Sequence, residues 1–104
     1  MGGDSQVEFS AEACDGAVIV RGDVDLASAP RFEHALADAL EAGRGDLVVD
    51  LGGVAFMDSS GMTVLVRIFK TLDSEGRALR LVHLNSSVRR ALEVGGVDSF
   101  ASFG

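Results

Sequence analysis

Residues 55–62 read Ala-Phe-Met-Asp-Ser-Ser-Gly-Met, and they mark the point where an apolar strand gives way to an amphipathic helix. The strand, 47–51, is short and strongly apolar, and apolar residues recur at helical spacing from about Ser60 to Glu75. A helix that starts here has unpaired backbone N–H groups, and the positive end of its dipole, beside Asp58 and the two serines. Because an added anion is tolerated at such a place, the stretch predicts a surface that a reversible charge on a serine changes without unfolding the domain.

The residues upstream predict a β-hairpin. Apolar and polar residues alternate over 7–13, which is the pattern of a half-buried strand. Asp15-Gly16 follows, and then residues 17–20 are apolar on both faces, as in a central strand. Two such runs joined by Asp-Gly are typical of a hairpin with a type I′ turn. We expect residues 1–6 to form a flexible N-terminus.

Helices and strands alternate over the rest of the chain. Ser28 is expected to cap a helix that runs to about Ala42, with Pro30 in its first turn. Gly52-Gly53 is expected to end the strand over 47–51, and Gly76 is expected to stop the helix that starts near Ser60. The remaining expected elements are a strand over Leu79–Leu84, a short helix capped by Asn85 and extending through Leu92, and a short strand over Ser99–Phe103.

This order of elements predicts an α/β fold. Crossovers through helices favour parallel neighbours, whereas the opening hairpin requires one antiparallel pair. We therefore expect a mixed β-sheet. The length of 104 residues suits a single domain spanning 1–104.

The charge and composition argue against several classes of function. Nine basic residues against sixteen acidic ones give a net charge of −7, whereas binding to nucleic acid or to an anionic membrane relies on clustered Lys and Arg. The sequence starts without a secretory signal and contains no apolar run as long as a membrane span, so we expect a cytoplasmic protein. Cys14 is the only cysteine, which excludes an internal disulfide.

Enzymatic chemistry has little support in the sequence. The Gly-x-Ser-x-Gly spacing of a nucleophilic serine is absent, and His34 and His83 occupy positions typical of surface or half-buried residues. Two histidines and one cysteine at these spacings form no metal motif. The two carboxylates of residues 22–25 are more typical of a solvated loop than of an acid/base pair. We expect no enzymatic activity, no cofactor and no metal.

Two interpretations of the 58–62 stretch stay open. Helix capping alone accounts for one Asp or Ser, but three capping residues in a row exceed what one helix end needs. Gly61 in the first turn costs about 0.5–1 kcal/mol relative to Ala, which favours close approach of another molecule to the backbone. Met62 and Val66 extend the apolar stripe of the helix, either as an exposed docking patch or as residues covered by a neighbouring helix or the terminal segment.

The run Phe56-Met57-Asp58-Ser59-Ser60-Gly61-Met62, after its apolar strand, resembles the bacterial anti-sigma factor antagonists of the STAS domain family. The run Gly22-Asp23-Val24-Asp25-Leu26 is similar to the Gly-Glu-Leu-Asp loop of that family, and the order of elements agrees from Val7 to Phe103. The resemblance implies a mixed sheet with helices mainly on one face. It also implies a C-terminal helix that this sequence, which ends at Gly104, does not contain.

The resemblance further implies a phosphorylation switch. The unphosphorylated form would bind an anti-sigma factor that is also an ATP-dependent serine kinase, and would thereby release the sigma factor. Phosphorylation of the serine before the glycine, Ser60, would separate the complex, and a serine phosphatase would reset it. The partner contacts that the resemblance implies are Asp25, Asp58 and Ser59, and the arguments from the helix start and its apolar stripe add Gly61 and Met62. Two alternatives are an accessory subunit of a transporter and a scaffold unit of a stress-signalling assembly.

Overall fold

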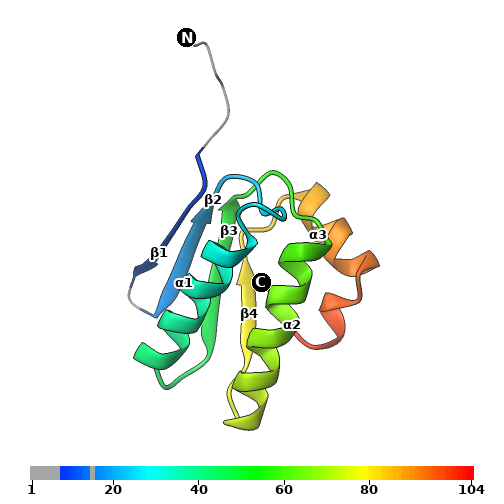
Figure 1. Ribbon diagram of the computed structural model, residues 1–104. Helices are drawn as coiled ribbons and strands as arrows, with labels where there is room; N and C mark the ends of the chain where they lie inside the picture. The colour runs from blue at the N-terminus through cyan, green and yellow to red at the C-terminus, as the bar shows by residue number, and fades with distance from the viewer. Residues whose placement is uncertain (1–7, 15) are drawn as a thin grey trace.

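The computed structural model describes residues 8–14 and 16–104 (Figure 1). In chain order the elements are β1 (Ser10–Cys14), β2 (Ala17–Arg21), α1 (Ala29–Ala42), β3 (Leu47–Gly53), α2 (Ser59–Ser74), β4 (Leu79–Val82), α3 (Ser86–Val94), the 3₁₀ turn η1 (Val97–Ser99) and β5 (Ser102–Phe103). The flexible N-terminus expected for residues 1–6 lies outside the described residues.

The five strands form one mixed sheet in the order β1-β2-β3-β4-β5. The β1–β2 pair is antiparallel, and the other three pairs are parallel, which confirms the predicted sheet. Cys14 pairs with Ala17, so the hairpin has the expected two-residue turn, and Gly16 has φ +85° as a type I′ turn requires at its second position. Asp15 lies outside the described residues, so the type I′ turn itself stays a prediction.

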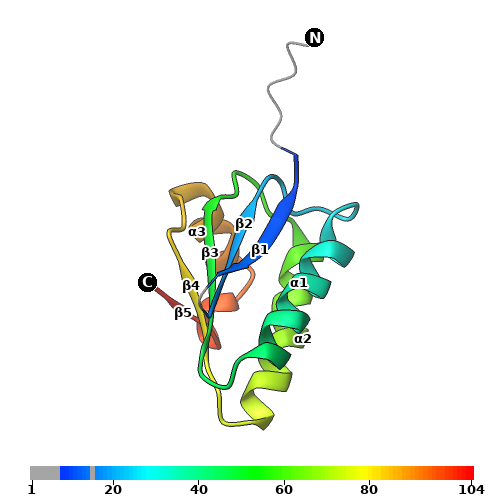
Figure 2. The same ribbon diagram turned by 90° about the vertical axis from the view of Figure 1, so that its left-hand side faces the viewer.

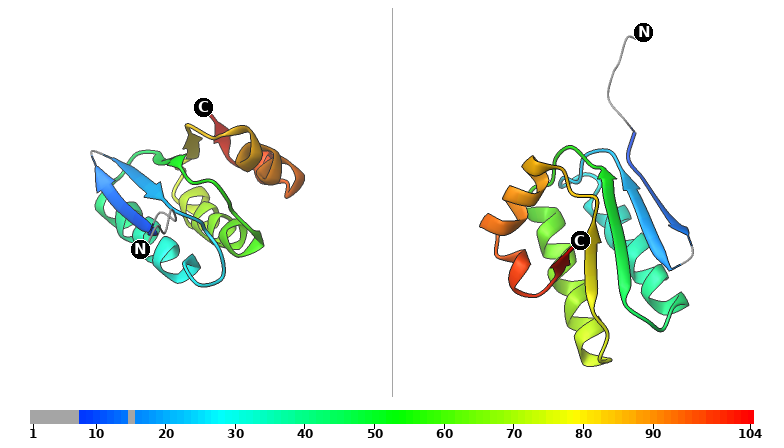
Figure 3. Two further views of the ribbon diagram at one scale, coloured as in Figure 1. Left: turned by 90° about the horizontal axis from the view of Figure 1, so that it is seen from above. Right: turned by 180° about the vertical axis from the view of Figure 1, so that it is seen from behind.

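The helices form a layer on one side of the sheet. Figure 2 shows α1 and α2 side by side against the same face, and Figure 3 shows α3 beyond them at the β4–β5 end. Because β2, β3 and β4 run in the same direction, their carboxyl ends meet at one edge of the sheet, at the top of Figure 1. The connections that follow these strands therefore share one end of the molecule.

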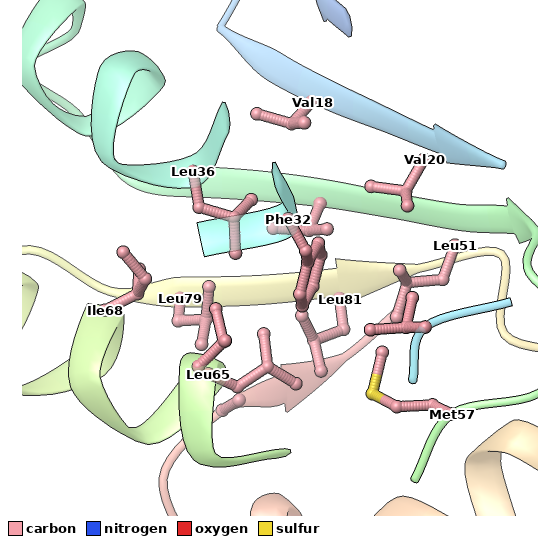
Figure 4. Close-up of a cluster of buried hydrophobic side chains, with 14 of the residues drawn as sticks. Val18, Val20, Phe32, Leu36, Leu51, Met57, Leu65, Ile68, Leu79 and Leu81 are labelled. Atoms are coloured by element: carbon pink, nitrogen blue, oxygen red, sulfur yellow. The ribbon is translucent and has the colours of Figure 1, made fainter. Parts of the chain in front are cut away.

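Alternate residues of the strands point into the helical layer and form the core (Figure 4). Val18 and Val20 of β2 and Leu81 of β4 are fully buried, and they face Phe32 of α1 and Leu65 of α2. Burial of each such side chain stabilises the fold by about 1.5–3 kcal/mol. This packing fixes α2, and with it the start of that helix, against the centre of the sheet.

β3 continues through Gly52 and Gly53, although the sequence predicts that these glycines end the strand. A Cβ at Gly53 would lie 2.7 Å from Cγ of Arg21 and 3.2 Å from the carbonyl oxygen of Val20. The glycine therefore allows β2 and β3 to stay paired where their register shifts, between Ile19 and Arg21. Gly-Gly marks a close approach of two backbones here, and not a break.

Other boundaries differ by a few residues from the prediction. β1 begins at Ser10, α2 begins at Ser59, and α3 continues to Val94. β4 ends at Val82 because His83 adopts a left-handed conformation with φ +61°. The strand expected over 99–103 is divided between η1 and the two-residue β5.

Candidate functional site

The connections after β2 and β3 are joined by backbone hydrogen bonds at the upper edge of the sheet. The Val24 N–H donates to the Phe56 carbonyl at 2.9 Å, and the Asp58 N–H donates to the Val24 carbonyl at 3.1 Å. Val24 and Met57 thus form a parallel bridge outside the named strands. The acidic loop predicted from 22–26 and the serine-bearing stretch are therefore neighbours in one rigid unit.

Asp58 is the N-cap of α2. Its Oδ1 accepts the Ser60 N–H at 2.8 Å, and its backbone carbonyl accepts the N–H groups of Gly61 at 3.1 Å and Met62 at 3.3 Å. The sequence predicts unpaired N–H groups at this helix start, but Asp58 satisfies two of them, those of Ser60 and Gly61, and the Met62 N–H makes the first regular bond of the helix. An anion on a neighbouring serine thus meets the helix dipole together with the Asp58 carboxylate.

The two serine hydroxyls are not used for capping. Ser59 is exposed and Ser60 is half-buried, and within 8–14 and 16–104 neither Oγ has a hydrogen-bond partner. The nearby side-chain bond from Thr63 Oγ1 goes to the backbone carbonyl of Ser59. Since capping explains Asp58 but neither serine, both hydroxyls are available to another molecule.

Gly61 is buried, and its packing gives a reason for the glycine besides the expected close approach of a partner. A Cβ at this position would lie 2.7 Å from Cγ1 of Val24 and 2.8 Å from Cγ of Met57. Gly61 is therefore required by the packing of the α2 start against the bridge that joins the two connections.

The half-buried Met62 lies against the end of α3. A Cβ on Gly95 would meet the Met62 sulfur at 2.5 Å, so the glycine makes room for this thioether. Val66, one turn later, is also half-buried. Of the two interpretations of the wide apolar stripe, the structure supports the neighbouring helix as the cover for Met62.

Asp25 shapes the acidic loop. Its Oδ1 accepts the backbone N–H groups of Ala27 at 3.0 Å and Ser28 at 3.1 Å. Ser28 occupies the expected N-cap position of α1 but makes no capping bond, because its Oγ donates to the Asp23 carbonyl at 2.8 Å and accepts the Asp25 N–H at 3.0 Å. The sequence did not indicate these bonds, which fix the loop beside an open depression of about 520 Å³.

The two histidines lie away from this site, each beside a carboxylate. His34 Nε2 lies 3.6 Å from Asp38 Oδ2 on the exposed side of α1, and His83 Nδ1 lies 2.9 Å from Asp50 Oδ2. Burial raises the pKa of Asp50, but the hydrogen bonds from the Gly52 N–H and His83, together with the charges of His83 and Arg21, hold it below its ordinary value of 3.8.

Two other kinds of site are absent from the described part of the chain. No group of three or more His, Cys, Asp or Glu side chains there is arranged to hold a metal ion. Within the same ranges, no helix combines the length and the apolar character needed to cross a bilayer.

Comparison with known proteins gives consistent matches. The STAS domain family model matches residues 8–103. The anti-sigma-B factor antagonist of Bacillus subtilis is 34% identical over 80 residues, which are 77% of this chain and 72% of the relative. A crystal structure of an anti-sigma factor antagonist from Mycobacterium paratuberculosis has a TM-score of 0.75 at 27% identity and covers 98% of this chain and 87% of its own.

A more distant likeness extends to the anti-sigma factor antagonist SpoIIAA in two forms. Its unphosphorylated structure has a TM-score of 0.72 at 19% identity, covering 93% of this chain and 88% of its own. The phosphorylated form, from Bacillus, has a TM-score of 0.64 at 17% identity, covering 93% and 91%. These two matches show the shared fold, and together with the family match over residues 8–103 they lead to one conclusion: the chain belongs to the STAS domain family.

Proposed function

We propose that the chain is an anti-sigma factor antagonist, which in its unphosphorylated form binds an anti-sigma factor in the cytoplasm and so releases a sigma factor. The observation that carries the proposal is the Asp58-Ser59-Ser60-Gly61 helix start with its two unbonded hydroxyls, in a chain 34% identical to an anti-sigma-B factor antagonist. The protein acts by binding and not by catalysis. Its surface around Asp25, Asp58, Ser59 and Met62 meets the partner.

Ser60 is the phosphoacceptor in this proposal, the anti-sigma factor is the serine kinase, and a serine phosphatase removes the phosphate. A phosphoserine adds a charge of about −1.5 to −2, which takes the net charge from −7 to about −9. The Asp58 carboxylate already holds the Ser60 N–H at 2.8 Å, so the phosphate adds a second anion at the same turn. Charge repulsion and the cost of desolvating the phosphate then oppose docking. SpoIIAA has known structures in both the unphosphorylated and the phosphorylated form, which supports such a switch.

The test is incubation of the purified chain with candidate anti-sigma factors of its organism and Mg-ATP, followed by mass-spectrometric mapping of the phosphate. We expect phosphate on Ser60 and dissociation of the complex. The Ser60→Ala variant should bind the anti-sigma factor without accepting phosphate. The Ser60→Asp variant should bind at least 100-fold more weakly than the wild type but unfold at the same temperature. Ser59→Ala is the matched control. Phosphate on another residue with Ser60 unmodified would refute the site, and absence of binding to every anti-sigma factor would refute the function.

A further inference from the structure

We propose that the anti-sigma factor binds to the exposed apolar side chains of Leu26, Phe56 and Val94, which we name the apolar rim. This inference rests on the proposed function. Among residues 8–14 and 16–104 they are the large hydrophobic side chains that are exposed, with 78%, 50% and 81% of their surfaces accessible. Single exposed apolar residues are common when scattered. These three instead all come from segments next to the first turn of α2.

Leu26 and Phe56 stand on one preformed unit. Leu26 comes two residues after Val24, whose N–H is bonded to the Phe56 carbonyl at 2.9 Å. The Asp25 carboxylate closes the turn that carries Leu26 by accepting the Ala27 and Ser28 N–H groups. Because these connections are already ordered, their exposed side chains lose little conformational freedom when a partner covers them.

Val94 lies on the other side of the α2 start. It is the last residue of α3, and the next residue, Gly95, packs against the sulfur of Met62. Figures 1 and 3 show the end of α3 beside α2, on the side opposite the connection that carries Leu26. The start of α2, where Ser59 and Ser60 stand in sequence, therefore lies between these two segments.

The charges around the apolar rim favour a basic protein as its occupant. Residues 22–28, 54–62 and 91–98 contain several Asp and Glu but no Lys or Arg. Beside Leu26 and Phe56, the open depression is lined by Glu8, Asp23 and Asp25, and Arg31 is the one Lys or Arg among its described lining residues, so it suits a long basic side chain. A second copy of this chain would bring acidic surfaces together, and an anionic membrane or nucleic acid would be repelled.

The position of the apolar rim also accounts for the effect of a phosphate. A partner that covers Leu26, Phe56 and Val94 must exclude water from the start of α2 between these segments. A phosphate on Ser60 would then be desolvated beside the Asp58 carboxylate, and residues 22–28, 54–62 and 91–98 contain no Lys or Arg to pair with it. Apolar contact and phosphate repulsion thus act at the same interface.

The test measures binding of the unphosphorylated chain to the anti-sigma factor that phosphorylates it, by calorimetry. We expect Leu26→Ser and Phe56→Ser each to weaken binding roughly 10- to 100-fold, since each removes the burial of one large side chain. Val94→Ser should weaken binding several-fold, whereas Phe56→Leu, which keeps most of the apolar area, should bind within about threefold of the wild type. Ala42→Ser, an exposed apolar residue at the far end of α1, is the control.

The outcomes separate this inference from the proposed function. If the kinase modifies Ser60 of the wild type but Leu26→Ser and Phe56→Ser bind as the wild type does, the function stands and the apolar rim is wrong. If the wild type binds no anti-sigma factor, both are wrong. If sedimentation shows a wild-type dimer that the same substitutions dissociate, the rim is a contact between copies and the inference is overturned.

Discussion

At the scale of single residues, Gly61 is noticeable in the sequence, but its structural role becomes clear only in the folded chain. The sequence indicates a glycine that costs helix stability, and the structure places its backbone against Val24 and Met57, so that an added methyl group would lie 2.7 and 2.8 Å from their side-chain carbons. We expect Gly61→Ala to lower the free energy of unfolding by about 1–3 kcal/mol, because overpacking outweighs the gain in helix propensity. Urea unfolding of the purified variant measures this change.

Gly45→Ala is the matched control, since a Cβ at Gly45 meets nothing within 4 Å and its backbone needs no left-handed conformation. This control should unfold within about 0.5 kcal/mol of the wild type. If Gly61→Ala is as stable as the wild type but loses its partner, the glycine serves the interface and the packing explanation fails.

The Asp58 side chain carries the second residue-scale prediction. Asp58→Ala removes the acceptor of the Ser60 N–H and should destabilise the fold by about 0.5–2 kcal/mol. Asp58→Asn keeps an oxygen in the same place and should cost less than half as much. Thermal unfolding of the two variants side by side checks the difference, and equal losses would show that the negative charge, and not the hydrogen bond, stabilises the helix start.

At the scale of elements, Asn85 joins the start of α3 to the connection after β3. Its Oδ1 accepts the Val88 N–H at 2.8 Å, as the predicted cap requires, and its Nδ2 donates to the Val54 carbonyl at 2.7 Å. Asn85→Asp keeps the cap but leaves the Val54 carbonyl facing a carboxylate. We expect a loss of about 1–3 kcal/mol, measured by chemical unfolding.

Ser86→Ala, at the exposed neighbouring position, controls for a local change at the same helix end and should be nearly neutral. An Asn85→Asp variant as stable as this control would mean that water replaces the Nδ2 bond without cost. Proton exchange at the Val88 N–H reports separately whether the cap survives the substitution.

The types of the elements follow from the sequence better than their ends do. Periodicity and capping residues place α1, α2 and α3 because those signals are local. The ends of β3 and β4 depend on partners that are distant in the chain: Gly53 stays in β3 because Arg21 lies beside it, and the left-handed His83 ends β4. Likewise, Ser28 occupies the predicted N-cap position, but its hydroxyl bonds to the preceding loop.

At the scale of the whole molecule, the sheet topology and the family were predictable, whereas the surroundings of the serines were not. An opening hairpin followed by helical crossovers limits the sheet to few arrangements. The sequence does not show that Val94 lies exposed beside α2, because the short helix is expected to extend only through Leu92 and its position against α2 depends on residues distant in the chain. That contact follows from the packing of Gly95 on Met62, which only the folded chain brings together.

The sheet face opposite the helices carries a dependence of stability on pH. Asp50 of β3 accepts a bond from the Gly52 N–H at 2.9 Å and pairs with His83, which follows β4, and these interactions lower its pKa below 3.8. A carboxyl whose pKa is lower in the folded state stabilises the fold above its unfolded pKa, and this contribution is lost as the pH falls through the folded value. Because His83 is largely exposed, we expect the contribution to be below about 1 kcal/mol.

Thermal unfolding from pH 7 down to pH 2 tests this dependence in the wild type and in Asp50→Asn. The variant should be less stable at neutral pH and should lose less stability over the acidic range, so the two curves should converge at the acid end. Asp73→Asn makes the same change of charge at an exposed position of α2 and should follow the wild-type curve. The difference between the two stability curves is the contribution of the Asp50 carboxyl group. If the curve of Asp50→Asn also runs parallel to the wild-type curve at all pH values, the pair of Asp50 and His83 does not link protonation to folding.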